Sequence, residues 1–198
     1  MESVRVTEWV DIQAPRAEVF NLIVDIEKRM QLSPLWGIAK IENPSHDYPN
    51  EGNSYDVEIH EKAGSCFETI VTAFKPLTKL AYKSMFENNA SITWNFQEVL
   101  QGTRLIYTEE FQTDGEESKE LRDQVQKIVH QWLTNIRRYA ELRGTRTKRL
   151  AKWLVDRFYI KLMPAQRQTV ATILYMQAIG AITFIMAALA LGVAYFLF

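Results

Sequence analysis

The segment 118–143 carries the pattern that most constrains how this chain folds. Its apolar residues recur at steps of three and four, so on a helix they form one stripe about 100° wide. The stripe consists of Leu121, Val125, Ile128, Val129, Trp132, Ile136 and Tyr139. Another apolar surface has to cover such a stripe, and we expect the segments before it to provide that surface.

The residues before this helix alternate between apolar and polar over short stretches, which predicts strands. Tyr55, Val57 and Ile59 alternate with polar residues, as in a strand with one solvent-facing side. Turn-forming residues separate the predicted strands, which lie at 4–12, 37–42, 55–59, 66–74, 80–86, 92–96 and 103–111.

Between the first two strands the apolar spacing is helical. Pro15 suits the first position of a helix, and Phe20 and Ile23 belong to its apolar face. The charged residues of 25–29, Arg29 among them, interrupt that face before a second short helix. One strand, two short helices, about six antiparallel strands and one long helix predict an α+β fold, in which a curved sheet holds the long helix across its concave face.

Four short segments resemble a known superfamily. Residues 10–20 and 23–27 resemble the start of the polyketide cyclase/dehydrase and coenzyme-Q-binding proteins, the START-like, helix-grip or SRPBCC superfamily. Residues 94–96 and 102–105 are similar to its late-strand tryptophan and its Gly-Thr turn. The resemblance covers about residues 3–142, and members include lipid carriers, quinone-binding proteins, cyclases and binding-only modules. It therefore implies the fold and a cavity between sheet and helix, but no single function.

Aromatic and aliphatic side chains on the presumed inner face of the sheet predict the wall of that cavity. With Trp132 of the long helix, the candidate ligand-binding residues are Tyr82, Phe86, Ile92, Trp94, Phe96, Leu105 and Tyr107. Such a wall suits a flat or chain-like apolar molecule, for example an isoprenoid quinone, a lipid or a pigment precursor. The alternative is that these residues form a filled core packed on Trp132 and Ile136.

Catalysis has only one weak candidate, Glu109. Strand alternation places it on the face of Leu105 and Tyr107, where it could act as an acid or base, or could simply reach water at the strand end. The sequence contains no metal-ligand spacing, no nucleophile with a partner base and no glycine-rich phosphate loop. We expect neither a cofactor nor a metal, and a single cysteine, Cys66, indicates a reducing compartment.

Charge divides the chain into three parts. Residues 1–142 carry 15 Lys and Arg against 23 Asp and Glu, residues 143–167 carry 8 against 1, and residues 168–198 carry none. A basic segment followed directly by an apolar one favours anionic lipid headgroups over nucleic acid as its partner. We predict a helix-grip domain at 1–143, a basic interfacial segment at 144–167 and a C-terminal anchor at 168–198.

The apolar tail is predicted to cross a membrane. Residues 178–198 include no charged side chain, and a 21-residue helix is long enough for about 30 Å of hydrocarbon. The N-terminus lacks the pattern of a signal peptide, so we expect a single-pass, tail-anchored protein whose N-terminal domain lies on the cytoplasmic face.

The basic segment is predicted to be an amphipathic helix, 146–163, lying in the headgroup layer before a bend at Pro164. The alternative is an ordinary solvated linker helix. The candidate membrane-interface residues are Arg149, Lys152, Trp153, Arg157 and Phe158.

A row of small residues within the tail indicates a possible partner helix. It is formed by Gly180, Thr183, Ala187, Ala190 and Ala194. Three functions are compatible with these patterns: a membrane-tethered module that binds or transfers an apolar metabolite, a cyclase- or dehydratase-like enzyme, and an accessory subunit of a larger membrane complex.

Overall fold

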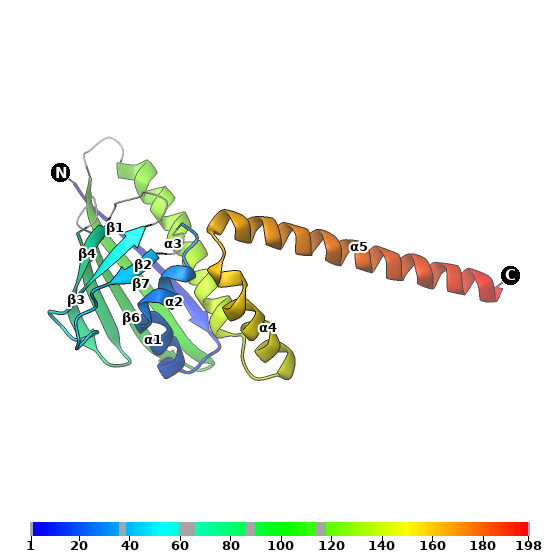
Figure 1. Cartoon of the computed structure of the whole chain (residues 1–198), viewed down its shortest axis with the longest axis horizontal. Coiled ribbons are helices and arrows are strands. Elements are labelled where there is room, and N and C mark those ends of the chain that lie inside the picture. The colour runs from blue at the N-terminus through cyan, green and yellow to red at the C-terminus, as the bar shows by residue number, and fades with distance from the viewer. Residues whose placement is uncertain (1, 36–38, 60–65, 86–89, 114–117, 198) are drawn as a thin grey trace.

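The structure, a computed structural model, describes residues 2–35, 39–59, 66–85, 90–113 and 118–197 and confirms the predicted α+β helix-grip fold (Figure 1). One antiparallel sheet has the strand order β1-β7-β6-β5-β4-β3-β2. Its strands are β1 (Glu2–Ile12), β2 (Ala39–Glu42), β3 (Ser54–Ile59), β4 (Cys66–Lys75), β5 (Lys79–Ser84), β6 (Ser91–Val99) and β7 (Gly102–Thr113). The helices are α1 (Arg16–Val24), α2 (Ile26–Gln31), α3 (Ser118–Ala140), α4 (Arg146–Arg157), the 3-10 helix η2 (Tyr159–Lys161) and α5 (Pro164–Leu197).

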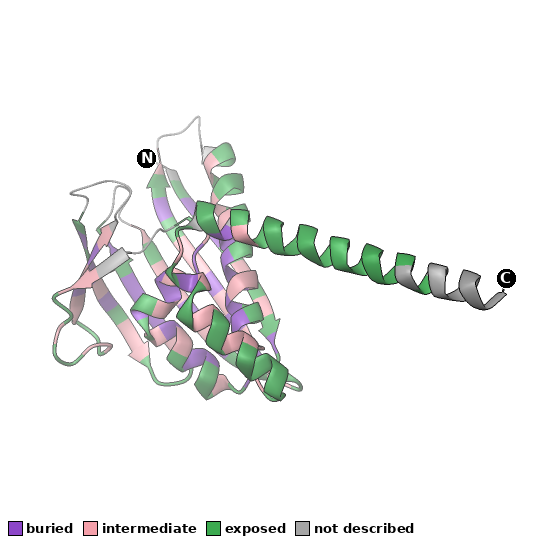
Figure 2. Ribbon diagram, turned by 45° about the vertical axis from the view of Figure 1, so that its right-hand side comes forward, coloured by how far each residue is buried: buried purple, intermediate pink, exposed green. Residues whose placement is uncertain are grey.

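Helix α3 places its predicted stripe against the sheet (Figure 2). Val129, Trp132 and Ile136 are buried, whereas Leu121 and Val125, nearer the start of the helix, are only half-buried. The covering surface is therefore complete at the C-terminal half of α3 and incomplete at its N-terminal half.

The Gly-Thr turn ties the start of β7 to the end of β1. Gly102 has a φ of 144°, and a Cβ at this position would lie 2.1 Å from the carbonyl oxygen of Ile12. The buried Thr103 hydroxyl donates a hydrogen bond of 2.8 Å to the Ala14 carbonyl. This motif is therefore structural, because only glycine allows so close an approach of the two backbones.

Helix α2 differs from its prediction at one residue. Asp25 caps the helix by accepting a hydrogen bond of 3.0 Å from the Lys28 amide, as its charge suggests. Arg29, however, does not belong to a polar break, because only 1% of its surface is exposed. It lies three residues after the buried Ile26, and residues at that spacing share one helix face.

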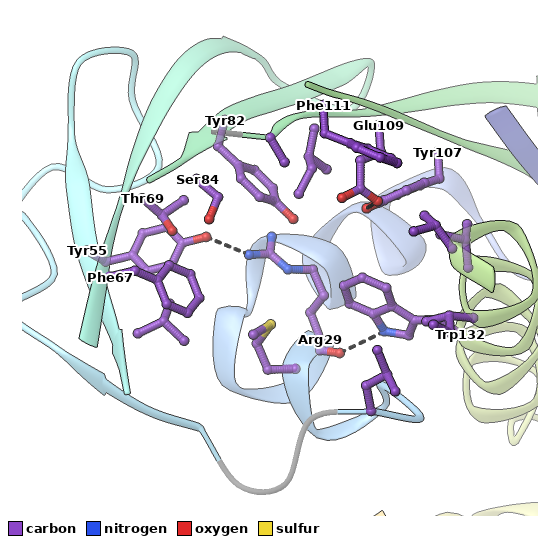
Figure 3. Close-up of a pocket in the computed structure, with 18 of the residues that line it drawn as sticks. Arg29, Tyr55, Phe67, Thr69, Tyr82, Ser84, Tyr107, Glu109, Phe111 and Trp132 are labelled. Atoms are coloured by element: carbon purple, nitrogen blue, oxygen red, sulfur yellow. Dashed lines mark hydrogen bonds between the residues drawn. The ribbon is translucent and has the colours of Figure 1, made fainter. Parts of the chain in front are cut away.

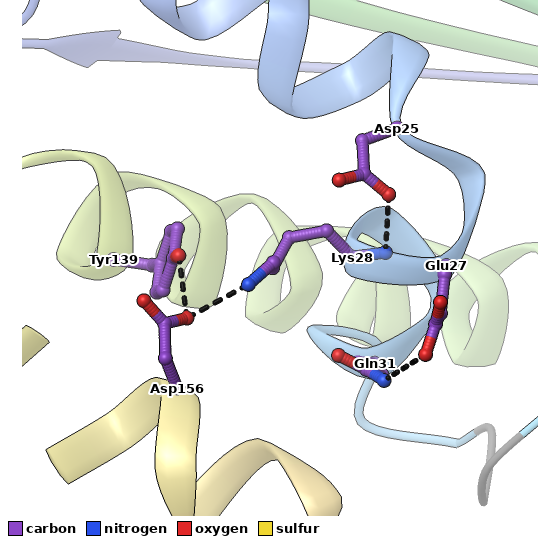
Figure 4. Close-up of polar contacts among 6 residues, drawn as sticks. All are labelled: Asp25, Glu27, Lys28, Gln31, Tyr139 and Asp156. Carbon is purple, nitrogen blue, oxygen red and sulfur yellow. Dashed lines mark hydrogen bonds and ion pairs between the residues drawn. The ribbon is translucent and has the colours of Figure 1, made fainter. Parts of the chain in front are cut away.

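Helix α4 is attached to the domain by a polar cluster at its inner side (Figure 4). The Asp156 carboxylate lies 2.8 Å from the Lys28 ammonium and accepts a hydrogen bond of 2.7 Å from the Tyr139 hydroxyl. Val155 packs beside this cluster against the hydrophobic core, together with Ile160 of η2. One side of α4 is therefore anchored to α2 and α3.

The outer side of α4 exposes apolar and basic residues together. Trp153 and Phe158 are 56% and 58% exposed and their rings lie 6.1 Å apart.

The predicted helix 146–163 is wrong in its length: it ends at Arg157, since Phe158 leaves helical geometry and a 3-10 turn follows.

Helix α5 projects away from the domain after Pro164 (Figure 1). Within the part of the chain that the structure describes, one helix is long and apolar enough to cross a membrane, at Ala165–Ala187. Residues 171–187 of this helix are exposed. The first turn is different, because the Arg167 side chain is buried against the domain.

Candidate functional site

A cavity of about 220 Å³ lies between the inner face of the sheet, helix α2 and the N-terminal half of α3 (Figure 3). It occupies the region where the stripe of α3 is only partly covered. Most of its lining is apolar and comes from both layers. The apolar lining residues include Met30, Val57, Phe67, Ile92, Phe111, Leu121, Val125, Ile128 and Val129.

The structure separates the predicted ligand-binding residues into two groups. Four of them, Tyr82, Ile92, Tyr107 and Trp132, line the cavity. Trp94, Phe96 and Leu105 share the inner face of the sheet but lie in the filled core and do not border the cavity. The last predicted residue, Phe86, lies outside the described residues.

Helix packing explains why the second group is covered. Phe96 meets Phe20 of α1 edge to face, with ring centroids 5.2 Å apart. Trp94 lies under Trp132, at 5.3 Å and almost perpendicular to it. The Trp94 indole also donates a hydrogen bond of 3.2 Å to the Tyr82 hydroxyl, so this cluster holds part of the cavity wall in place.

Arg29 is a charged cavity residue that the sequence analysis missed. Its guanidinium donates through Nη1 to the Ile23 carbonyl and through Nη2 to the Tyr55 hydroxyl, both at 2.8 Å. The Tyr82 ring lies 4.8 Å from its Cζ. Trp132 fixes the backbone of the same residue by donating a hydrogen bond of 3.0 Å to the Arg29 carbonyl.

The Nε of Arg29 is buried and has no hydrogen-bond partner among the residues that the structure describes. The only signal for this placement in the sequence is its spacing from Ile26, which the charged neighbours obscure. Two buried side chains with hydroxyl groups, Thr69 and Ser84, also line this end of the cavity and were not predicted.

Glu109 lines the cavity, as strand alternation suggested, and is half-buried. Its carboxylate accepts a hydrogen bond of 2.7 Å from the Tyr107 hydroxyl. Burial raises the pKa of Glu109, and the hydrogen bond from Tyr107 opposes that shift only in part. Burial and the neighbouring Glu109 carboxylate raise the pKa of Tyr107 well above its ordinary value.

The described residues contain no group of three or more His, Cys, Asp and Glu side chains that could hold a metal ion. His46 and His130 are exposed and lie outside the cavity lining. The polar chemistry at the described cavity surface therefore comes from the arginine, the carboxyl group and the hydroxyl groups described above.

The predicted membrane-interface residues lie on α4 and at its end. Arg149, Trp153, Arg157 and Phe158 are exposed. Lys152 is half-buried, and its ammonium lies 5.0 Å from the centre of the Tyr139 ring.

Along the predicted seam of α5, Gly180, Thr183 and Ala187 are exposed. The side chains of Ala190 and Ala194 lie outside what the structure describes.

Comparisons with known proteins agree with this fold. A family model described as Activator of Hsp90 ATPase homolog 1-like protein matches residues 13–141. A comparison with curated proteins found no match.

Solved structures share the architecture at low sequence identity. A protein from Chromobacterium violaceum has 16% identity and a TM-score of 0.53, covering 70% of this chain and 97% of its own. A protein from Bacillus halodurans has 15% identity and a TM-score of 0.55, covering 69% and 97%. The di-domain ARO/CYC protein StfQ of the steffimycin biosynthetic pathway has 14% identity and a TM-score of 0.55, covering 70% of this chain and 51% of its own.

Proposed function

Because this chain belongs to the family of Activator of Hsp90 ATPase homolog 1-like proteins, whose helix-grip domain encloses a cavity here, we propose that it is a membrane-tethered module that binds an apolar small molecule. The molecule would lie between the sheet and α3. In this proposal α5 spans the bilayer and keeps the domain beside the membrane from which the ligand comes.

The observation that carries this proposal is the mainly apolar cavity itself. Small-molecule sites are concave, mostly apolar and supplied with a few polar groups, and they usually have volumes of about 300–1,000 Å³. At about 220 Å³, this cavity suits a ring system or a short chain better than a complete isoprenoid quinone. A ligand that buries about 200 Å² of apolar surface would gain roughly 5 kcal/mol before association costs.

The exposed surfaces of α4 and α5 support the tether. The outer side of α4 combines Trp153 and Phe158 with Arg149 and Arg157, a composition typical of helices in the headgroup layer. We propose that this side faces anionic lipids on the cytoplasmic leaflet. The small residues Gly180 and Thr183 would then allow a second helix to approach α5 within the bilayer.

Glu109 favours a second candidate function. A carboxyl group with a raised pKa, hydrogen-bonded to a buried phenol inside an apolar cavity, is a suitable acid or base for a cyclase- or dehydratase-like reaction. The fold shared with StfQ is compatible with this candidate. A Glu109→Gln variant distinguishes the two functions, because it should retain binding but lose any turnover.

The proposed binding is tested by mass spectrometry of solvent extracts from protein purified gently from its own membrane. We expect one enriched apolar molecule in the wild type and its loss in Val125→Trp, which fills the cavity from α3. Gln124→Trp, on the exposed side of the same helix, is the matched control and should retain the molecule. The same extract composition in all three proteins would contradict the proposal.

A further inference from the structure

We propose that the ligand is an apolar carboxylic acid and that its carboxylate binds to Arg29. This inference rests on the proposed function, because it names the chemical class that the cavity selects. It starts from a buried cation that faces the cavity rather than a protein carboxylate (Figure 3).

Arg29 is charged and has no acidic partner among the residues that the structure describes. An arginine remains protonated at any ordinary pH, and proteins rarely bury one without pairing its charge. The carboxylate within the cavity lining belongs to Glu109, which is hydrogen-bonded to Tyr107 instead. The positive charge at this end of the cavity is therefore not neutralised by a described side chain.

The guanidinium also has donors to spare. An arginine offers five N–H groups, and the hydrogen bonds to Ile23 and Tyr55 use two of them. The Nε–H is buried, and none of the described residues accepts a hydrogen bond from it. A carboxylate matches the planar fork of a guanidinium and can accept two parallel hydrogen bonds from it.

The rest of the cavity matches the two ends of such a molecule. Figure 3 shows Tyr55, Thr69 and Ser84 together near the guanidinium, so hydroxyl groups surround the place for an anionic head. The α3 side of the lining is apolar, with Val125 and Ile128 among its residues, and suits a hydrocarbon body. A neutral apolar ligand would leave the Arg29 charge buried and unpaired, which is the costlier state.

The test compares two probes of nearly equal size on the full chain in phosphatidylcholine nanodiscs, by equilibrium dialysis corrected with empty nanodiscs. The probes are 1-naphthoate, an acid, and 1-naphthalenemethanol, its neutral counterpart. We expect the wild type to bind the acid at least about tenfold more tightly, as one charged hydrogen bond implies. Arg29→Met should remove this preference while retaining binding of the alcohol.

The outcomes separate this inference from the proposed function. Equal affinity of the wild type for both probes, or an acid preference that survives in Arg29→Met, would overturn the role of Arg29. If the alcohol still binds and Val125→Trp abolishes that binding, the cavity remains a binding site. If Val125→Trp changes the binding of neither probe, the proposed function fails as well. If Arg29→Met does not fold, Arg29→Lys and the ratio of the two affinities in the wild type test the role of Arg29. Lysine keeps the positive charge but lacks the planar fork of the guanidinium.

Discussion

The cavity and the joint between the domain and α5 each contain a buried arginine, and the two use their hydrogen-bond donors differently. Arg167, 8% exposed, donates through Nε to the Leu162 carbonyl at 2.8 Å, through Nη2 to the Ile160 carbonyl at 2.7 Å, and through Nη1 to the Gln31 carbonyl. Every nitrogen of its guanidinium therefore donates a hydrogen bond to a backbone carbonyl. The Nε of Arg29 donates to none of the described residues, and Arg29 lines a cavity.

This difference shows how a structural cation can be distinguished from one that is available to a ligand. Backbone carbonyls are part of the folded chain and, unlike a ligand, cannot dissociate. Arg167 therefore stabilises one fixed arrangement of α2, η2 and α5. Arg29 lines a cavity, and its Nε–H has no partner among the described residues, so this donor is available to a small molecule. Burial alone does not separate the two cases, but the pairing of each N–H group does.

The largest effect is expected for Arg167→Met. Three carbonyls, one at the end of α2 and two in and directly after η2, lose a charged donor, so we expect the joint to lose about 2–4 kcal/mol of stability. Hydrogen exchange measured by mass spectrometry should show faster exchange over residues 159–167, while the strands of the sheet keep their protection. Unchanged exchange in this segment would show that Arg167 is not the residue holding α5 to the domain.

The Glu109→Gln variant tests whether water is excluded from the cavity, as the proposed pairing of Arg29 with a ligand carboxylate requires. Burial raises the pKa of Glu109 above its ordinary value of 4.5, so between that pH and the raised value the folded state binds more protons than the unfolded one. Stability therefore falls as the pH rises through this window. Glutamine is neutral and can still accept from Tyr107.

The melting temperature of Glu109→Gln should equal that of the wild type near pH 4 and lie a few degrees higher near pH 8. Thermal unfolding of the full chain measures both values. A lower melting temperature than wild type at pH 8 would indicate that the ionised carboxylate is stabilising, and hence that this part of the cavity is well solvated.

Lys28→Met should have a smaller effect, because the Lys28 and Asp156 side chains are 25% and 35% exposed. Water screens such a pair, and we expect a loss of about 0.5–1 kcal/mol that shrinks with added salt. Burial alone would raise the pKa of Asp156, but hydrogen bonds from Lys28 and Tyr139 outweigh this effect and hold the pKa below its ordinary value. The contribution of Asp156 is therefore lost only as the pH falls through that lowered value. A loss as large as that of Arg167→Met would mean that the cluster in Figure 4 attaches α4 to the domain as strongly as Arg167 attaches α5.

The smallest effect on stability is expected for Arg29→Met. Removing a buried, unpaired charge offsets the loss of its hydrogen bonds to Ile23 and Tyr55, so the free energy of unfolding should change by less than about 1 kcal/mol. Denaturant titration without added ligand checks this. A loss of more than about 3 kcal/mol would place Arg29 in the same structural class as Arg167.

The sequence predicted the fold because the relevant signals are local. The apolar stripe around Trp132, the alternation in the strands and the Gly102 turn depend on spacing alone, and the structure confirms the architecture they imply. Tyr82 and Tyr107 were likewise placed on the inner face by alternation.

The polar parts of the site and the joint could not be predicted because they depend on distant partners. Arg29 looked like part of a charged run, yet its hydrogen-bond partner Tyr55 comes from β3. Arg167 looked like part of the basic segment, yet it donates a hydrogen bond to the carbonyl of Gln31, 136 positions earlier in the chain. The spacing of apolar residues also could not predict which inner-face residues border the cavity. Helix α1 covers Phe96, and Trp132 covers Trp94.

The most direct test is an experimental structure of the full chain with 1-naphthoate bound. We expect the naphthalene ring against Val125 and Ile128 and a carboxylate oxygen within hydrogen-bond distance of the Arg29 Nε. A probe bound elsewhere, or bound in the cavity with its carboxylate turned away from Arg29, would contradict the central claim that this arginine selects an acidic ligand.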